Sequence, residues 1–354
     1  MGQMVSCLKL KKPKIMQTKK KCFIGVDISK RWFDICMMLI NQGRREMCRE
    51  RFDNDVAGFK KLSQWLRLHK VPLDDNTLVV IENTGIYHRM IWEYCNQKGL
   101  PISIVNAAQL KWSLGITRGK DDVTDSERLC DYCYRHADKL KASALLDPTI
   151  LQLKDLMTSR TRLLTQINST RTYLQELKHA NSKEVQAMME QIHKSALIGM
   201  KKSLELIEEQ IRNVIRQSAA IKNNYELLLS VPGIGHVTAV YIICCTANFA
   251  SSITGKQLAC YAGVVPFEHS SGSSIKGKAR VHKMANKELK RLLYMGARSV
   301  VQHKGEFRQY YKRKEHEGKH HLAILNAVKN KIVLRAVAVI KNQTKYVDNY
   351  QKAA

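Results

Sequence analysis

Four carboxylates occupy positions from which they could act together on a phosphate. Asp27 and Glu82 each end a short apolar segment that predicts a strand. Asp122 and Asp125 stand three residues apart at the start of a predicted helix, on one side of it. Acids at neighbouring strand ends, faced by acids from a helix, can hold Mg²⁺, and two such ions can clamp both oxygens of a phosphoryl transfer. Each acid alone is typical of a turn or helix N-cap, whereas the four together favour a metal site.

A second group of residues could act on the same phosphate. Residues 266–274 (PFEHSSGSS) hold four serines, and Lys276, Lys278, Arg280 and Lys283 follow them. A serine in a loop beside several cations can attack a phosphate whose charge the cations stabilise. A polar linker followed by a phosphate-binding basic stripe is the alternative, and residue chemistry alone favours it. That chemistry does not choose among the serines.

The segment 231–235 (VPGIG) precedes an apolar helical stretch. A Pro-Gly-x-Gly turn leaves backbone N–H groups uncovered beside a helix N-terminus, which suits a DNA phosphate, as in helix–hairpin–helix motifs. Gly233 and Gly235 are therefore predicted to bind nucleic acid, although many ordinary turns share this pattern.

The charge of the chain points to a polyanionic partner. Its 354 residues include 59 Lys and Arg against 31 Asp and Glu, a net charge of +28, while hydrophobic residues make up an ordinary 44%. Residues 273–354 hold 20 Lys and Arg against 5 acids, whereas residues 22–145 hold 19 against 16. This balance disfavours a disordered tail protein and a small-metabolite enzyme. Nucleic acid is the expected partner and an anionic membrane surface the rival, although no apolar stretch is long enough to span a bilayer.

Short strands that alternate with helices must position the four acids. Residues 22–145 predict an α/β domain, a sheet flanked by helices. The expected strands are 23–28, 32–40, 47–53, 78–81 and 102–105, and the expected helices are 57–69, 86–97 and one from about 122. Cys130 and Cys133 lie on that last helix. No second ligand pair follows at zinc-site spacing, so they predict packing of a helix face.

The rest of the chain is predicted to be helical. Apolar residues recur every three or four positions from Leu153 to about Ile215, with a turn at 179–183, which predicts a long helical hairpin or coiled coil. Ten Cys without framework spacing, and no secretory signal, predict a cytoplasmic protein. The expected divisions are a basic N-terminal arm (1–21), a catalytic α/β domain (22–145), the helical hairpin (146–226) and a mainly helical C-terminal domain (227–354).

Three motifs resemble the acidic motifs of the DEDD transposases of the insertion sequence 110 (IS110) family. They are GVDISK at 25–30, IENTG at 81–85 and RGKDDVTDS at 118–126. The third departs from the family pattern R-x-K-T-D-x-x-D-A at Asp121 and Ser126. Its D-x-x-D register is kept, so Asp122 and Asp125 match the family's acids.

Two C-terminal motifs resemble the transposase domain of the same family, and the match spans nearly the whole chain, from Phe23 to about Tyr346. These motifs are VPGIG at 231–235 and YAGVVP at 261–266. The family's nucleophilic serine stands directly before a glycine, a few residues after the proline of the second motif. The matching residue here is Ser271, rather than Ser270, Ser273 or Ser274.

This resemblance implies an α/β RNase H-like (RuvC-like) N-terminal domain, a helical coiled coil and a mainly α-helical C-terminal transposase domain that carries a helix–hairpin–helix-like turn and a serine loop. It implies two Mg²⁺ ions per site on Asp27, Glu82, Asp122 and Asp125, and Ser271 as the nucleophile that forms a covalent protein–DNA ester. The implied partners are double-stranded donor and target DNA and a structured non-coding guide (bridge) RNA. A homo-oligomer, dimer or tetramer, would complete each active site from two subunits. No membrane is expected, and the implied location is the bacterial cytoplasm, in association with the nucleoid.

The sequence therefore predicts an RNA-guided DNA transposase or recombinase that mobilises an insertion sequence by serine transesterification. A site-specific DNA invertase of the same superfamily is one alternative, and it differs in what it rearranges rather than in its chemistry. A metal-dependent junction endonuclease would need the four acids but not Ser271. A non-catalytic nucleic-acid-binding protein, such as a decayed transposase, is a further alternative, against which the intact acids and serine argue.

Overall fold

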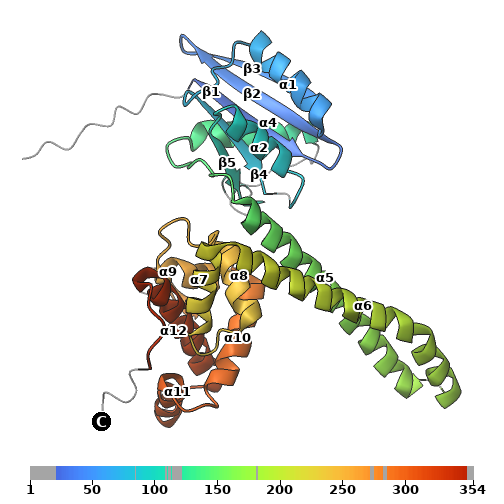
Figure 1. Ribbon diagram of the computed structural model, residues 1–354. Helices are drawn as coiled ribbons and strands as arrows, with labels where there is room; N and C mark the ends of the chain where they lie inside the picture. The colour runs from blue at the N-terminus through green and yellow to red at the C-terminus, as the bar shows by residue number, and fades with distance from the viewer. Residues whose placement is uncertain are drawn as a thin grey trace, which may run out of the picture. The chain divides into compact units, whose positions relative to one another are not determined.

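The computed structural model describes residues 21–83, 85–107, 110, 113, 122–180, 182–271, 275–281 and 285–348. Side chains are described for the same residues except 122–123, 180, 267–271 and 275–280. The chain divides into two compact units, Met1–Leu145 and Leu146–Ala354, the first a mixed α/β unit and the second mostly helical (Figure 1). The predicted basic arm, apart from Lys21, and the predicted contact residue Lys283 lie outside the described residues.

The first unit is a five-stranded sheet in the order β3-β2-β1-β4-β5. Neighbours among β1, β2 and β3 are antiparallel, whereas β4 is parallel to β1 and β5 is parallel to β4. The central strands are apolar and almost wholly buried, which is typical of strands covered on both faces. The bounds are β1 Cys22–Ile28, β2 Trp32–Asn41, β3 Arg44–Asp53, β4 Thr77–Glu82, β5 Ile102–Val105, α1 Val56–Leu68, α2 Arg89–Gln97 and α4 Asp122–Arg135.

Different helices cover the two faces of this sheet. On one face, Phe33 of β2 stacks against Phe59 of α1, and Phe59 stacks against Tyr94 of α2, with ring centroids 5.3 and 5.2 Å apart. On the other face, α4 packs Leu129 and Cys130, with their neighbours, into a core with alternate residues of β1, β2 and β4. Residues two apart on a strand share a face, so the side chains that meet α4 are fixed by strand register.

The second unit begins with a long helical hairpin of α5 (Pro148–Ala180) and α6 (Lys183–Gln217), as predicted (Figure 1). The Ser182 side chain caps α6 by accepting a hydrogen bond from the Val185 N–H. An ion pair at 2.9 Å joins Arg160 to Glu208 across the hairpin. The helices that follow are α7 Ala219–Leu229, α8 His236–Thr246, α9 Gly255–Tyr261, α10 Lys287–Val300, α11 Glu306–His316 and α12 His321–Asn342.

The segment predicted as a serine loop is a β-hairpin instead. Strands β6 (Phe267–Ser271) and β7 (Ile275–Arg280) pair antiparallel, with Ser271 opposite Ile275 and Ser270 opposite Lys276. Short polar side chains made this segment look like a flexible loop, but strand pairing satisfies the backbone groups that a loop would leave to water. No helix within the described residues is long and apolar enough to cross a membrane.

Candidate functional site

Strand register brings Asp27 and Glu82 together at one edge of the sheet. The last parallel pair that joins β1 to β4 is Val26 opposite Ile81, and each acid is the next residue on its strand. Because side chains alternate between the faces of a sheet, both acids project on the face that also carries Gly25. This is the face that α4 covers.

A glycine brings α4 onto this face. A Cβ at Gly25 would overlap the backbone of Ser126, Leu129 and Cys130, so only glycine allows the helix to lie this close to β1. The Cys130 thiol donates a hydrogen bond to the Phe23 carbonyl at 3.3 Å, whereas Gly25, two residues later on β1, also meets the earlier helix residue Ser126, so α4 runs antiparallel to β1. The first turn of α4, which carries Asp122 and Asp125, therefore lies toward the strand ends where Asp27 and Glu82 stand.

The carboxylates of this edge are not assembled into a metal site within the described side chains. Asp125 is 34% exposed at its side chain and pairs with Arg128 at 2.8 Å. No three described His, Cys, Asp or Glu side chains lie close enough together to hold an ion. Asp122, on the same turn, is described by its backbone only. The donor set itself, four carboxylates without thiol or imidazole, fits a hard divalent cation.

The structure adds a fifth acid that the sequence analysis missed. Asp34 of β2 lies directly opposite Asp27 and is only 6% exposed. The Arg51 guanidinium donates two hydrogen bonds, each 2.9 Å, to the two Asp34 carboxylate oxygens. The Arg51 guanidinium also lies over the Trp32 ring, 5.2 Å from its centroid. Cross-strand neighbours reveal this pair, and no spacing in the sequence gives their register.

Cys130 and Cys133 take the packing role predicted for them. Both side chains are fully buried on the sheet side of α4, and the Cys133 thiol donates a hydrogen bond to the Leu78 carbonyl at 3.3 Å. Helical spacing thus turns both thiols toward the sheet.

In the second unit, the β6–β7 hairpin carries Ser271 at the end of one strand, and Lys276, Lys278 and Arg280 on the other. The hairpin thus brings the predicted serine and three predicted phosphate-binding residues into one two-stranded ribbon. The two compact units are described separately, so no distance joins Ser271 to the acids.

The predicted Pro-Gly-x-Gly turn joins α7 to α8. Gly233 has φ of +88°, and a Cβ there would lie 3.2 Å from the Gly296 carbonyl oxygen of α10 and 2.9 Å from the Ile332 side chain of α12. Close packing and the positive φ therefore both require glycine at position 233. Gly235 is exposed, with open space around it, and precedes the first turn of α8.

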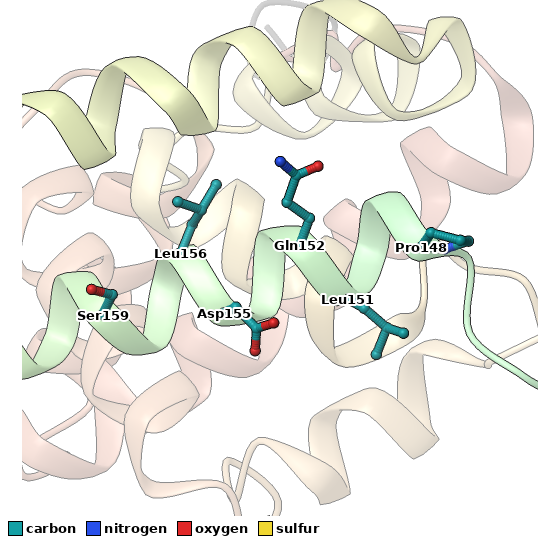
Figure 2. Close-up of a pocket in the computed structure, with 6 residues that line it drawn as sticks. All are labelled: Pro148, Leu151, Gln152, Asp155, Leu156 and Ser159. Atoms are coloured by element: carbon teal, nitrogen blue, oxygen red, sulfur yellow. The ribbon is translucent and has the colours of Figure 1, made fainter. Parts of the chain in front are cut away.

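One described hollow lies along the start of α5 (Figure 2). Leu151 and Asp155 point to one side of the helix and Gln152 and Leu156 to the other. A single helix supplies all its lining and Asp155 is its only charged side chain, so it holds no catalytic constellation.

Two family models match the chain. One, a transposase model for the DEDD type of the IS110 group, matches residues 24–180, and the other, the IS116/IS110/IS902 transposase family, matches residues 225–312. The chain is 28% identical over 338 residues to the pilin gene-inverting proteins of Moraxella bovis and Moraxella lacunata, covering 91% of this chain and 96% of each relative. It is 23% identical over 306 residues to the transposase for insertion sequence element IS1111A of Coxiella burnetii, covering 79% of this chain and 78% of that protein.

The sheet, its acidic edge and these matches define a DNA recombinase or transposase with an RNase H-like domain. The chain belongs to the IS110 family of transposases. The DEDD type of domain indicates dependence on a divalent metal ion.

Proposed function

We propose that this protein cuts and rejoins DNA by serine transesterification, guided by a structured non-coding RNA, and thereby mobilises an insertion sequence. The observation that supports the proposal is the close approach of α4 to Gly25, which brings the first turn of α4 toward the edge where Asp27 and Glu82 lie at the ends of β1 and β4. The basic hairpin of the second unit supports it, because it joins Ser271 to cations suited to a DNA phosphate.

In this proposal Asp27, Glu82, Asp122 and Asp125 would hold two Mg²⁺ ions. When bound, the ions neutralise charge on the scissile phosphate. Arg128 donates a hydrogen bond to the Asp125 carboxylate in the structure. On metal binding, this arginine would have to release the carboxylate or share it with an ion. The pair holds the Asp125 side chain in place beforehand, which reduces the ordering needed on binding.

Ser271 would attack the phosphate that the acidic edge holds. A bond forms from Ser271 Oγ to phosphorus while the bond from phosphorus to one deoxyribose oxygen breaks. The serine proton leaves to solvent, and the departing oxygen takes up a proton. Attack by a DNA hydroxyl on the serine ester reverses these changes and rejoins the strand, so no outside energy source is needed.

Oligomerisation is the third part of the proposal. Met188, Ile192, Ile198 and Leu206 of α6 are each at least half exposed, which is unusual for large apolar side chains along one helix. Contact of this helix with a second copy, as a coiled coil, would cover them and bring acids and serine from two subunits to one DNA strand.

DNA inversion is a second candidate for the same chemistry. The two pilin gene-inverting proteins align along almost their whole length with this chain. Inversion and transposition differ in the placement of the two recombining sites, so a plasmid carrying the sites in inverted order, and another carrying the element with an empty target, separate them.

The test uses a nicked suicide DNA substrate, a guide RNA from the flanking DNA of the gene, and Mg²⁺. Wild-type protein and Ser270→Ala, the matched control one residue away, should form a protein–DNA adduct that resists denaturing gel electrophoresis. Ser271→Ala should form none, and Asp27→Asn should also leave the DNA uncut. Cleavage by Ser271→Ala at the wild-type rate would instead establish an endonuclease without a covalent intermediate.

A further inference from the structure

Lys329 of α12 is a buried lysine that forms no ion pair with any described acid. Lys329 is only 6% exposed. It lies on the helix face whose residues Leu325, Val328 and Ile332 pack into the core of the second unit. The ion pair of α12 belongs instead to Arg335, which binds Glu306 at 2.8 Å. Burial, with the nearby charge of Lys290, lowers the pKa of Lys329 to about 8. A lysine buried to this extent without an acidic partner is costly, so it calls for a functional explanation.

Two further cations surround the same spot. The Lys329 ammonium lies 5.8 Å from the centroid of the Tyr294 ring, and the Arg298 guanidinium lies 5.9 Å from it. Lys290, Tyr294 and Arg298 are spaced four residues apart on α10, so they form one stripe along that helix. Among the described residues neither Lys290 nor Arg298 pairs with an acid, whereas Arg291 on the same helix pairs with Glu288.

This cluster lies beside the stem of the serine hairpin. The Lys290 side chain lies 3.7 Å from where a Cβ on Gly263 would stand. Asn326, one turn before Lys329 on α12, donates a hydrogen bond to the Val264 carbonyl at 2.8 Å. The same two helices therefore hold the three cations and the backbone that leads into β6.

We propose that Lys290, Arg298 and Lys329, gathered around Tyr294, form a binding site for a backbone phosphate of the DNA strand on which the hairpin acts. The ligand is a phosphodiester. Three cationic side chains without a neighbouring acid suit an anion, and the guanidinium can bind two of its oxygens. The Tyr294 ring lies beneath the charged groups of Arg298 and Lys329 and is their partner when no ligand is bound. The choice of DNA rests on the proposed function.

Removing the unpaired charge of Lys329 should stabilise the fold while weakening DNA binding. Lys329→Met keeps the length and apolar stem of the side chain but removes the ammonium. The control is Lys331→Met, on the same helix. The Lys331 ammonium lies 4.7 Å from the Tyr310 ring centroid, and its charge helps to lower the pKa of Glu306. The full-length variants are compared by thermal unfolding and by fluorescence anisotropy with a duplex DNA and an RNA hairpin.

We expect Lys329→Met to raise the midpoint of thermal unfolding, weaken duplex DNA binding about tenfold, and lower the slope of log K against log salt by about one. Lys331→Met should leave the slope unchanged. Unchanged DNA affinity and slope for Lys329→Met, a loss confined to RNA, or a lowered unfolding midpoint would each overturn the proposal. The binding assay requires no cleavage, so Ser271→Ala should bind DNA like the wild type. A normal salt slope in Ser271→Ala without an adduct, beside a reduced slope in Lys329→Met, separates this site from the cleavage mechanism.

Discussion

In each unit a glycine allows two backbone segments to pack closely. Acidic residues lie near this contact in the first unit, and basic residues lie near it in the second. In the first, Gly25 allows α4 to lie on β1, and Asp27 and Glu82 follow at the ends of β1 and β4. In the second, Gly233 and Gly296 allow the α7–α8 turn to meet α10, and the cations of α10 and α12 gather around Tyr294. Each glycine contact fixes a backbone position, and the side chains that follow it are then set by helical or strand period.

The charged residues of the two candidate sites differ in how they are compensated. In the first unit, arginines hold two of the acids: Arg51 holds Asp34 with two hydrogen bonds, and Arg128 holds Asp125 with one. In the second, Lys290, Arg298 and Lys329 have no acidic partner among the described residues. In our proposals, the arginines order the acidic site before its ligand binds, whereas the site around Tyr294 keeps unpaired positive charge for a ligand that is itself an anion.

The glycine contacts give the largest expected effect on stability. Gly25→Val should destabilise the first unit and Gly296→Val the second, each by about 3–5 kcal/mol, because a side chain would push helix backbone away from its neighbour. Hydrogen exchange measured by mass spectrometry would show which unit loses protection.

The control for both glycines lies in a helix interior. Gly199 of α6 is exposed, and a Cβ at this position would meet no other atom within 4 Å, so Gly199→Ala should stabilise the chain by about 0.5–1 kcal/mol. Loss of protection spread equally over both units in either valine variant would show that the two glycines do not act locally.

Breaking the ion pair of the buried Asp34 with the half-exposed Arg51 should have a smaller effect. Arg51→Met leaves the Asp34 carboxylate, 6% exposed, without its two donors, and should cost about 1–3 kcal/mol in the free energy of urea unfolding. Arg291→Met, which removes the exposed partner of Glu288, should cost less than about 0.5 kcal/mol. Equal costs for the two variants would show that Asp34 does not depend on Arg51.

The smallest expected effect concerns buried thiols, in which the two units are alike. Burial raises the pKa of Cys95 in the first unit and of Cys244 in the second to about 12. A raised folded pKa means that stability is fully present below the unfolded pKa and is lost as pH rises toward the folded value. At pH 9 the loss is about 0.4 kcal/mol for each thiol.

Urea unfolding at pH 7 and pH 9 measures this loss. Cys95→Ala and Cys244→Ala should each reduce the pH dependence by a similar amount. A reduction in only one of the two would contradict equal burial of the thiols.

Several elements of the fold follow from periodicity alone. The predicted strand 23–28 is β1, the charged stretch 47–53 lies in the edge strand β3, and the helical pattern at 57–69 is α1 within one residue at each end. Long apolar patterns are decided by burial, which the sequence displays directly. The β6–β7 hairpin was missed because its serines and glycines are equally typical of loops.

The site is harder to predict because it depends on register and on contacts distant in sequence. Asp34 looks like one acid within an apolar strand, and only its position opposite Asp27 and Arg51 shows its surroundings. Lys329 does leave a trace, since it interrupts an apolar helical stripe that continues from Leu325 to Ile332. That interruption predicts a buried lysine, but the stripe of cations beside it comes from another helix.

The most direct test is to identify the residue that carries the DNA. Adduct formed on a suicide substrate with Mg²⁺ is digested with nuclease and protease, and the nucleotide-modified peptide is sequenced by mass spectrometry. We expect modification at Ser271, which the basic hairpin carries, and loss of that modification in Asp27→Asn, which changes only the acidic edge. A nucleotide on any other residue, or undiminished modification of Ser271 in Asp27→Asn, would contradict the claim that the two units act in one reaction.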